Sequence, residues 1–301
     1  MERIIRELEQ VLEKGQMLLN EPMDRHTTFR VGGPADYYLM PTAETLPKTI
    51  SLLKEYQIPV TVIGNGSNLL VSDAGIRGAV VEIGRRMSDI SVEGETITAR
   101  AGAMLSQVAV KAYKNGLSGM EFAAGIPGSV GGAVVMNAGA YGGEIKDILV
   151  FADVLDKDGE IKTFTNEQLE FGYRQSIISK QNYVAVCAKL RLHKAEPQAV
   201  KKKMEDLKER RISKQPLEFP SAGSAFKRPE GYFAGKLIMD AGLSGFSIGG
   251  AKVSEKHCGF VINQGGASAS DIYAVICHVQ KTVKEQFGVK LQTEVKLIGE
   301  F

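Results

Sequence analysis

Apolar residues recur at helical spacing along several stretches of the chain. At the N-terminus, Ile4, Ile5, Leu8, Val11 and Leu12 stand between charged residues, which predicts an amphipathic helix with one apolar stripe. Because charges interrupt this helix, it lacks the continuous apolar core of a secretory signal, and we expect a cytoplasmic protein. The same periodicity predicts further helices at residues 44–56, 105–114, 199–213, 233–241 and 270–287.

Short runs of β-branched and aromatic residues between turn formers predict strands. They lie at residues 37–40, 59–63, 79–83, 96–100, 148–155, 183–192, 259–262 and 295–298. Helices and strands are thus mixed along the chain, which favours a layered α+β architecture over a helix bundle or a β-sandwich.

A charged stretch separates two parts of the chain. Pro197 opens a predicted helix rich in lysine, arginine and glutamate, which ends before Pro216. Its basic residues, among them Arg210 and Arg211, are candidates for phosphate contact, but the acidic residues between them favour a solvent-facing connector. We therefore predict an N-terminal helix and lead-in at residues 1–24, a larger domain at 25–194 and a smaller domain at 195–301.

The overall composition is that of a globular protein with no strong field of either sign. Of the 301 residues, 44% are hydrophobic and 24% are charged, and Lys+Arg 37 against Asp+Glu 35 leaves a net charge of +2. This balance gives no global attraction for nucleic acid. We expect small-molecule substrates, and neither nucleic acid, a membrane nor an obligate protein partner.

No charged residue occurs between Phe122 and Gly143, and the segment 125–143 contains seven glycines. Glycine costs roughly 0.5–1 kcal/mol relative to alanine inside a helix or strand, so a cluster of glycines indicates a backbone that turns sharply or approaches a ligand. A membrane span is the alternative, but spans need about twenty mostly large apolar residues, and this segment is dominated by small ones. We predict a loop whose main-chain N–H groups face a phosphate or a flat ring.

A second glycine-rich loop follows the predicted strand at 59–63. Residues 64–68 read Gly-Asn-Gly-Ser-Asn, a run of donors that suits a pyrophosphate or a ribose, although Asn-Gly also forms plain turns. The pattern lacks the third glycine of a dinucleotide fingerprint, and the chain has no P-loop motif. Two such loops about sixty residues apart predict one extended cofactor, such as a dinucleotide, held largely by backbone.

The smaller domain contains a third unusual segment, residues 220–229, in which Ser224 stands between small residues. Small neighbours leave a hydroxyl accessible. A serine in such a segment is either a turn residue or a reactive group, and the segment alone does not decide between them.

These segments together resemble the UDP-N-acetylenolpyruvoylglucosamine reductase family, a family of flavoenzymes of bacterial cell-wall synthesis. The match extends over nearly the whole chain. Its motifs are residues 20–35, 64–70, 125–142, 171–174 (Phe-Gly-Tyr-Arg), 223–229, 249–254 and 291–299. Only residues 175–182 separate Arg174 from the strand predicted at 183, so the resemblance is to the type without a tyrosine lid loop.

The resemblance implies a two-part FAD-binding domain of the PCMH, or vanillyl-alcohol-oxidase-like, type and a smaller α+β substrate domain. It implies non-covalent FAD, with NADPH as the hydride-donating co-substrate. FAD carries the hydride chemistry, and UDP-N-acetylglucosamine enolpyruvate becomes UDP-N-acetylmuramate, a precursor for peptidoglycan, cell shape and cell division. The cofactor residues it implies are Gly64, Asn65, Gly66, Ser67, Asn68, Gly125, Pro127, Gly128, Ser129, Gly132, Ala133, Asn137, Gly139 and Ala140.

The resemblance also implies three catalytic residues. Arg174 is the permanent cation beside the developing negative charge, and Ser224 is the proton donor to carbon. Glu294 acts either as a neutral acid toward the substrate carboxylate or as an anchor for Arg174. Implied substrate contacts are Tyr173, Lys227, Arg228, His257 and Lys296, and no metal is implied.

Two alternatives remain at this point. One is another FAD oxidoreductase of the same superfamily; since neither glycine-rich loop contains the His or Cys that tethers FAD in many of these enzymes, non-covalent binding is expected here too. The other is a non-catalytic sensor of nucleotide sugars. A sensor has no use for a proton donor, so Arg174, Ser224 and Glu294 together favour an enzyme.

Overall fold

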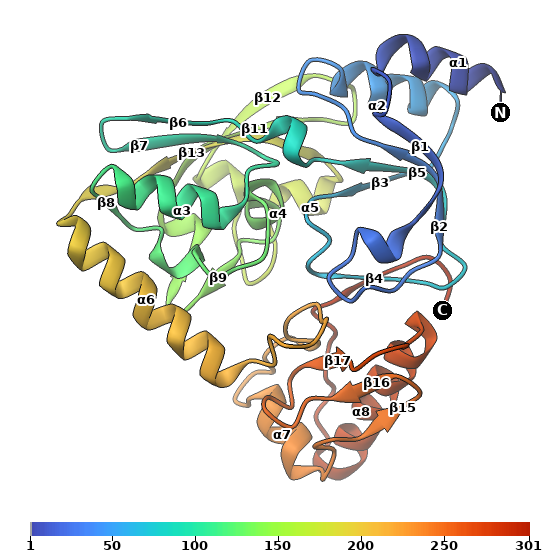
Figure 1. The fold of residues 1–301 in the computed structure, drawn as a ribbon, viewed down its shortest axis with the longest axis vertical. Coiled ribbons are helices and arrows are strands. Elements are labelled where there is room, and N and C mark those ends of the chain that lie inside the picture. Colours follow the sequence, from blue (N-terminus) through green and yellow to red (C-terminus); the bar gives the residue numbers. More distant parts are fainter. Residues whose placement is uncertain (1) are drawn as a thin grey trace. The chain divides into compact units, whose positions relative to one another are not determined.

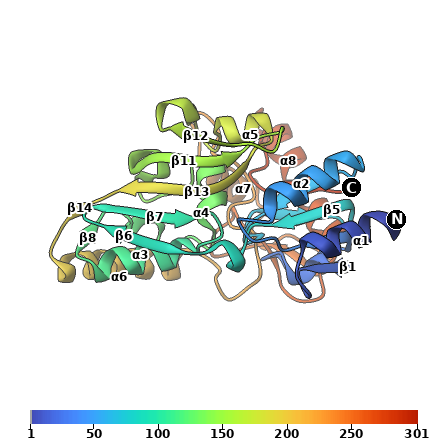
Figure 2. The same cartoon turned by 90° about the horizontal axis from the view of Figure 1, so that it is seen from above.

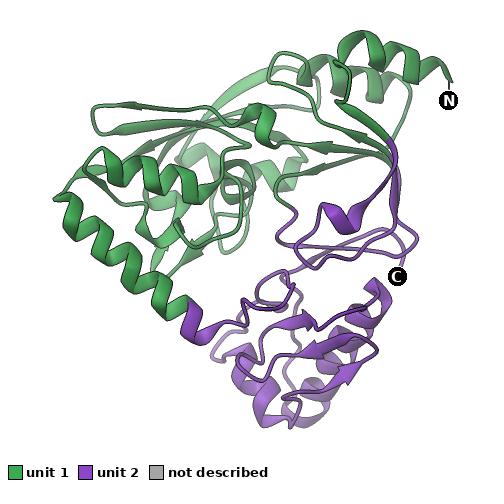
Figure 3. Ribbon diagram, in the orientation of Figure 1, with its two compact units in different colours: residues 1–18, 37–65, 78–211 green, residues 19–36, 66–77, 212–301 purple. Residues whose placement is uncertain are grey.

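The computed structural model describes residues 2–301, which form two compact units (Figures 1 and 3). Unit 1 consists of the chain up to Leu18, Tyr37–Asn65 and Gly78–Arg211; unit 2 consists of Leu19–Asp36, Gly66–Arg77 and Ile212–Phe301. Each unit has its own hydrophobic core. The units are discontinuous in sequence, whereas the domains predicted above are continuous segments, and those limits stay a prediction.

An antiparallel five-stranded sheet forms the centre of unit 1. Its strand order is β12-β11-β13-β7-β6, with β12 Ile161–Thr165, β11 Leu149–Leu155, β13 Val184–Arg191, β7 Thr96–Arg100 and β6 Ile90–Glu93. Figure 2 shows these strands side by side. The helices α3 (Leu105–Lys114) and α4 (Val130–Val135) pack against the sheet. Leu105, Val108 and Ala112 of α3 are buried, as their helical spacing predicts.

The N-terminal helix is confirmed and belongs to unit 1. Helix α1 (Glu2–Val11) packs against α2 (Leu46–Glu55), with Ile4 and Leu8 of α1 buried. A four-stranded sheet follows in the order β1-β2-β5-β3, formed by Met17–Pro22, Pro34–Leu39, Ile76–Glu82 and Val60–Ile63. Strand β3 is parallel to β5, and the limits of the two units fall within β1, β2 and β5.

The C-terminal helix α8 (Ala269–Phe287) organises the core of unit 2. Its residues Ile272, Val275, Ile276, Val279 and Val283 are all fully buried, because their spacing places them on one face. The helix packs against an antiparallel sheet of β15 (Ser247–Ile248), β16 (Ala251–Val253) and β17 (Val261–Asn263), and against α7 (Ala234–Asp240). A parallel pair, β4 (Leu69–Val71) with β18 (Lys296–Ile298), joins two distant segments of this unit.

The remaining elements are short, apart from α6. They are α5 Ile177–Gln181, α6 Pro197–Lys214, the strand pairs β8 Leu117–Ser118 with β14 His193–Lys194 and β9 Gly139–Ala140 with β10 Gly143–Glu144, and the 3₁₀ turns Met23–Arg25, Arg85–Met87, Glu121–Ala123, Ile145–Asp147 and Glu167–Leu169.

Every predicted helix and strand has a counterpart, with ends shifted by up to three residues, and the mixed α+β architecture is confirmed. The predictions missed β1, β4, β6, β12, β16, α5 and the two-residue strands, which offer little periodicity. They also missed α4, because glycine disfavours a helix by propensity. No helix in the described part of the chain has the length and apolarity to cross a membrane.

Candidate functional site

The first two residues of the first glycine-rich loop, Gly64 and Asn65, lie against the second loop in unit 1. The side-chain amide of Asn65 donates to the carbonyl oxygen of Pro127 at 2.7 Å. A Cβ atom on Gly64 would stand 2.3 Å from Oγ of Ser129, so no larger residue fits there without displacing that side chain. The two loops therefore adjoin at Gly64 and Asn65, while the cofactor that they are expected to share stays a prediction.

Several main-chain N–H groups of these loops have no protein acceptor. Within residues 2–301, none of the five N–H groups of residues 64–68 donates to the protein, and neither do those of Gly128 and Ser129. Consecutive unpaired N–H groups form a concave anion site. Their chemistry fits the diphosphate of a dinucleotide.

Helix α4 contributes less to this donor set than its position suggests. The N–H groups of Val130 and Gly131 donate to the carbonyls of Ala103 and Ala101 at 2.8 and 2.7 Å. The N–H of Gly132 points to Oγ of Ser129, the N-cap, at 3.4 Å. The unpaired donors thus precede the helix, while the contacts predicted for Gly132, Ala133, Gly139 and Ala140 stay predictions.

On the unit 2 side of the first loop, Gly66 approaches its neighbours closely. Its φ is +61°, and a Cβ atom would stand 1.8 Å from the carbonyl oxygen of His26. Gly66 in turn accepts the N–H of Thr28 at 3.2 Å. Oγ1 of Thr28 is the one buried side-chain polar atom without a hydrogen-bond partner among the described residues. A buried donor of this kind is normally satisfied, so it too fits a polar ligand at this loop.

Arg174 lies at the tip of a tight turn in unit 1. Gly172 and Gln175 exchange main-chain hydrogen bonds of 3.1 and 3.4 Å, and Arg174 has a φ of +56°. Left-handed backbone costs a non-glycine residue about 1–3 kcal/mol and is concentrated at functional sites. The guanidinium lies 5.3 Å from the ring centroid of Tyr173, which is itself exposed.

Asn137, a predicted cofactor residue, is engaged within the protein. Its side chain is 1% exposed, and both amide protons are donated, to Oε2 of Glu144 at 2.9 Å and to the carbonyl oxygen of Gly172 at 3.2 Å. The amide protons of Asn137 are therefore not available to a cofactor, and its predicted cofactor contact would have to be made by other atoms of the residue.

Three distant segments of unit 2 converge on Ser224. Ser224 pairs with Phe260, and the N–H of Ala225 donates to the carbonyl oxygen of Gly259 at 2.8 Å. On the other side, the N–H of Glu294 donates to the carbonyl oxygen of Ala225 at 2.9 Å. The structure therefore brings together Ser224 and Glu294, two predicted catalytic residues seventy positions apart. Ser224 is half-buried.

Asn68 connects the first glycine-rich loop to this cluster. Its side-chain amide donates to the carbonyl oxygen of Glu294 at 3.1 Å, and its own carbonyl accepts the N–H of Lys296 at 3.0 Å. The side chain of Lys296 is solvent-accessible, yet surrounding protein atoms lower the pKa of its ammonium group by desolvation. Two predicted ligand residues, Asn68 and Lys296, thus flank Glu294.

His257 lies next to the same segment. Nδ1 of His257 accepts the N–H of Gly259 at 3.2 Å, so the neutral ring carries its proton on Nε2. Burial lowers the pKa of the imidazole, which favours that neutral form. His257 therefore presents an N–H donor rather than a charge.

Two cations complete the predicted substrate residues of unit 2. The main-chain N–H of Lys227 donates to the carbonyl oxygen of Gln292 at 2.8 Å, which continues the pairing of this segment with the one containing Glu294. Arg228 is exposed, with its guanidinium 4.0 Å from the ring centroid of Phe233.

The sequence interpretation undervalued Arg211. This residue lies near the end of α6, and its guanidinium donates to the carbonyl oxygen of Gly125 in the second glycine-rich loop. Desolvation lowers the pKa of Arg211, while Tyr141 opposes the shift. Arg210 and Arg211 were candidates for phosphate contact, but the acidic residues of α6 favoured a solvent-facing helix, and nothing along the chain indicates the contact with Gly125.

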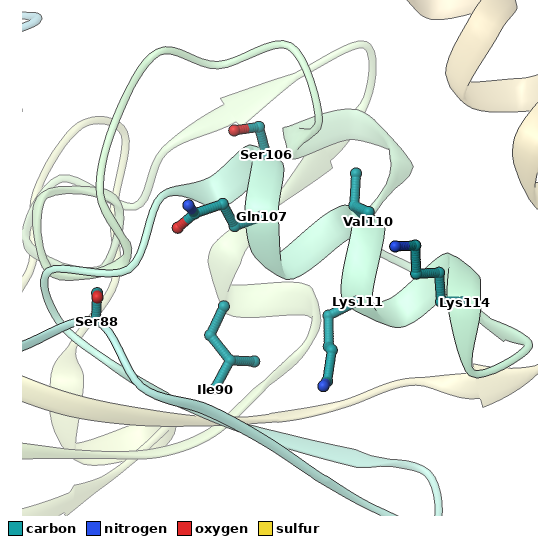
Figure 4. Close-up of a pocket in the computed structure, with 7 residues that line it drawn as sticks. All are labelled: Ser88, Ile90, Ser106, Gln107, Val110, Lys111 and Lys114. Atoms are coloured by element: carbon teal, nitrogen blue, oxygen red, sulfur yellow. The ribbon is translucent and has the colours of Figure 1, made fainter. Parts of the chain in front are cut away.

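A shallow groove of about 510 Å³ lies between β6 and α3 (Figure 4). Its lining residues include none of the predicted site residues; they are Ser88, Ile90, Ser106, Gln107, Val110, Lys111 and Lys114. No group of three or more His, Cys, Asp or Glu side chains within the described chain is placed to hold a metal ion.

Two protein families match parts of the chain. Residues 34–165 match the family described as an FAD binding domain. Residues 215–298 match the C-terminal domain of UDP-N-acetylenolpyruvoylglucosamine reductase. The second match covers Ser224, His257, Glu294 and Lys296.

Similar proteins carry the same description. The chain is 58% identical over 297 residues to a UDP-N-acetylenolpyruvoylglucosamine reductase of Agathobacter rectalis, covering 95% of each chain. It is 55% identical over 282 residues to one of Clostridium perfringens, covering 93% of this chain and 92% of the other.

Solved structures agree. The reductase of the same description from Thermus caldophilus superposes with a TM-score of 0.81 and 33% identity, covering 94% of this chain and 98% of that one. An alkyldihydroxyacetonephosphate synthase shares the fold over 64% of this chain and 41% of that one, with a TM-score of 0.51 and 17% identity.

Proposed function

Because the chain belongs to the UDP-N-acetylenolpyruvoylglucosamine reductase family, we propose that it reduces UDP-N-acetylglucosamine enolpyruvate to UDP-N-acetylmuramate with NADPH. The protein is an FAD-dependent oxidoreductase. The product is a peptidoglycan precursor, which places the enzyme in cell-wall synthesis. NADPH and the nucleotide sugar are its small-molecule substrates, and we propose a cytoplasmic location.

When bound, FAD would supply the hydride chemistry, by which the hydride of NADPH reaches the terminal vinyl carbon of the substrate. That carbon becomes a methyl group, and an electron pair is left on the adjacent carbon and its carboxylate. The reaction is completed when this adjacent carbon receives a proton. The protein must therefore stabilise negative charge at one position and deliver a proton to it.

Arg174 supplies the positive charge. A guanidinium offers two parallel N–H donors, which match a carboxylate. The left-handed backbone of Arg174 supports a functional rather than a structural reason for this side chain.

Ser224 donates the proton from Oγ. A serine hydroxyl is a weak acid, but the carbon it protonates is strongly basic, so the transfer is downhill once the charge has formed. Gly223 and Ala225 flank the hydroxyl and add no bulk. A proton returning from solvent, through water or the neighbouring Lys227, restores the hydroxyl.

Glu294 holds the other side of the reacting group. Its backbone is fixed by hydrogen bonds to Ala225 and Asn68, so its main chain keeps a constant position relative to the segment of Ser224. It contacts the substrate carboxylate as a neutral acid or anchors Arg174. His257, Arg228 and Lys296 provide donors for the nucleotide and lactyl portions.

The unpaired N–H groups of Gly64, Asn65, Gly128 and Ser129, all in unit 1, would hold the diphosphate of FAD. These four main-chain donors, which have no acceptor within residues 2–301, suit the acceptor oxygens of a diphosphate and need no metal ligand. Neither loop contains a histidine or cysteine, so FAD is held without a covalent bond.

The observation that carries this proposal is the pairing of the Ser224 segment with the Glu294 segment inside the part of the chain that matches the reductase C-terminal domain. The test is to purify the protein, measure FAD by its absorbance before and after acid precipitation, and follow NADPH oxidation with and without the enolpyruvyl nucleotide sugar. We expect FAD released by acid and substrate-dependent NADPH oxidation that yields the lactyl ether by mass. NADPH oxidation indifferent to the nucleotide sugar would overturn the reaction, and FAD remaining on the precipitate would overturn non-covalent binding.

A further inference from the structure

The turn that carries Arg174 is held from outside at both ends. At one end, the carbonyl oxygen of Gly172 accepts a side-chain proton from Asn137 at 3.2 Å. At the other end, the fully buried Ser176 donates its hydroxyl to the carbonyl oxygen of Val135 at 2.7 Å. Val135 is the last residue of α4 and Asn137 follows shortly after it. This segment of the second glycine-rich loop therefore makes two hydrogen bonds to the turn and its flanking residue Ser176. A residue with left-handed backbone such as Arg174 persists where its surroundings determine its conformation.

The orientation of the Asn137 amide is determined by its partners. Oδ1 accepts the main-chain N–H of Lys146 at 3.0 Å, and a main-chain N–H can only donate. Nδ2 therefore faces Gly172 and Glu144, both of which can only accept. Asn137 itself has a φ of +43°. The asparagine and Arg174, in the turn that it contacts, therefore both have left-handed backbone.

Glu144 adds charge to the arrangement. Its carboxylate lies 2.9 Å from Nζ of Lys146 and accepts from Asn137. The pKa of Glu144 is lowered by Lys146 first, then by Asn137, and also by the positive charge of Arg174. The carboxylate is thus an anion that Asn137 places near Arg174.

We propose that Asn137 is a positioning residue for Arg174, acting through the carbonyl of Gly172 and the carboxylate of Glu144. This rests on the proposed reaction, in which Arg174 stabilises the charge that develops after hydride transfer. Asn137 then affects chiefly the second half of the reaction, reoxidation by substrate, because Arg174 acts in that half; the two half-reactions are compared on protein saturated with FAD.

The variants are chosen for backbone geometry. Asn137→Gly removes the side chain and tolerates the positive φ, whereas alanine there would add backbone strain. Asn137→Asp keeps the shape but turns the donor into an anion facing Glu144. Asn166→Ala is the matched control: this asparagine donates to the carbonyls of Lys146 and Leu149 in the same unit, at 2.7 Å each, and does not contact the turn.

Both half-reactions are measured separately under anaerobic conditions by flavin absorbance. For Asn137→Gly and Asn137→Asp we expect reoxidation by the enolpyruvyl nucleotide sugar to slow about ten- to hundredfold, the scale of a misplaced catalytic group. At saturating FAD, reduction by NADPH should slow far less than reoxidation does, and both half-reactions of Asn166→Ala should stay within about threefold of wild type. Reoxidation within threefold of wild type, or an equal loss in both half-reactions, would overturn the proposal.

A double-mutant cycle tests whether Asn137 acts through Arg174. Glycine replaces both residues, since each has positive φ. In the Arg174→Gly background, Asn137→Gly should cause no further slowing, because the group it positions is gone. Multiplicative losses would show that Asn137 acts elsewhere and would refute the positioning role.

A crystal structure of Asn137→Gly separates this inference from the reaction itself. We expect the turn at residues 172–175 to lose its defined conformation or Arg174 to leave positive φ, whichever substrate the enzyme uses. An unchanged turn would contradict the inference even if the proposed reaction holds. A wild-type enzyme that ignores the nucleotide sugar would instead refute the reaction and leave the structural test to decide on Asn137.

Discussion

Glu294 donates its main-chain N–H to the carbonyl oxygen of Ala225 at 2.9 Å, which places it directly across from the segment of Ser224. Phe226 pairs with Thr293, and the N–H of Lys227 donates to the carbonyl oxygen of Gln292. Successive pairs therefore fix the register of the two segments. A register slip by one residue would turn one of the two side chains to the opposite face.

Replacement of Ser224 tests the proton donor. In Ser224→Ala, reduction by NADPH should proceed at the wild-type rate, while reoxidation by the enolpyruvyl nucleotide sugar should fall by about 10²–10⁴-fold, the usual contribution of general acid catalysis. Stopped-flow absorbance of the flavin measures both steps. Ser224→Cys should recover part of the rate, since a thiol is a stronger acid than a hydroxyl. Equal rates of reoxidation in the alanine variant and wild type would exclude Ser224 as the acid.

Arg174→Gly should separate stability from activity. Glycine relieves the left-handed strain at φ +56°, so the free energy of unfolding should stay unchanged or increase by up to about 1 kcal/mol. Reoxidation by substrate should nevertheless collapse by at least about 10²-fold, because one preorganised charge contact is lost. Urea titration followed by circular dichroism gives the stability. A clear loss of stability would mean that Arg174 holds the turn rather than serving the reaction.

Alanine substitutions at two glycines with similar φ separate the steric cost of a Cβ atom from the cost of a left-handed backbone. Gly66 has φ +61° and a blocked Cβ position, whereas Gly94 has φ +59° and open space around it. Both alanine variants incur backbone strain, but Gly66→Ala also pushes against the carbonyl of His26, which should cost about 1–3 kcal/mol more. Gly66→Ala should also weaken FAD binding. The comparison uses thermal unfolding and FAD titration of the apoprotein, and equal losses in the two variants would contradict it.

Acid stability should depend on Asp156. Nζ of Lys162 and the N–H groups of Glu160 and Asp158 bind its carboxylate, and they lower the pKa of Asp156 to about 2. Because the folded pKa is depressed, this stabilisation is present above the unfolded pKa of about 4 and is lost as pH falls through 2.

Asp156→Asn should therefore lower the Tm at pH 7, and the difference from wild type should shrink between about pH 4 and pH 2. Asp158→Asn is the control, since that exposed carboxylate has only a 3.6 Å ion pair with Lys54. A Tm difference that stays constant over this range would show that folding does not lower the pKa of the Asp156 carboxyl group.

Local pattern was sufficient for the elements with strong periodicity. Helix α8 follows directly from the spacing of Ile272, Val275 and Val279, and α6 begins at Pro197 as expected. Helix α4 could not be predicted, since its glycines have low propensity and the helix depends on the Ser129 cap and on hydrogen bonds to Ala101 and Ala103.

The site was predictable only in part. The composition of the two glycine-rich loops indicated a special role. In the structure, Asn65 donates a hydrogen bond to Pro127 of the second loop, and Gly64 lies close to Ser129. The roles of Ser224, Arg174 and Glu294 came from the family resemblance, because a single serine, arginine or glutamate carries no local signal. The contacts of Asn137 and Arg211 depend on residues distant in sequence, so no pattern along the chain reveals them.

The most direct test of the account is the reoxidation half-reaction of the wild-type protein. The bound FAD is first reduced anaerobically with one equivalent of NADPH, and the enolpyruvyl nucleotide sugar is then added while the flavin absorbance is recorded. We predict rapid, stoichiometric recovery of the oxidised spectrum together with one equivalent of UDP-N-acetylmuramate, identified by mass. A flavin that remains reduced in the presence of the nucleotide sugar would contradict the proposed reaction.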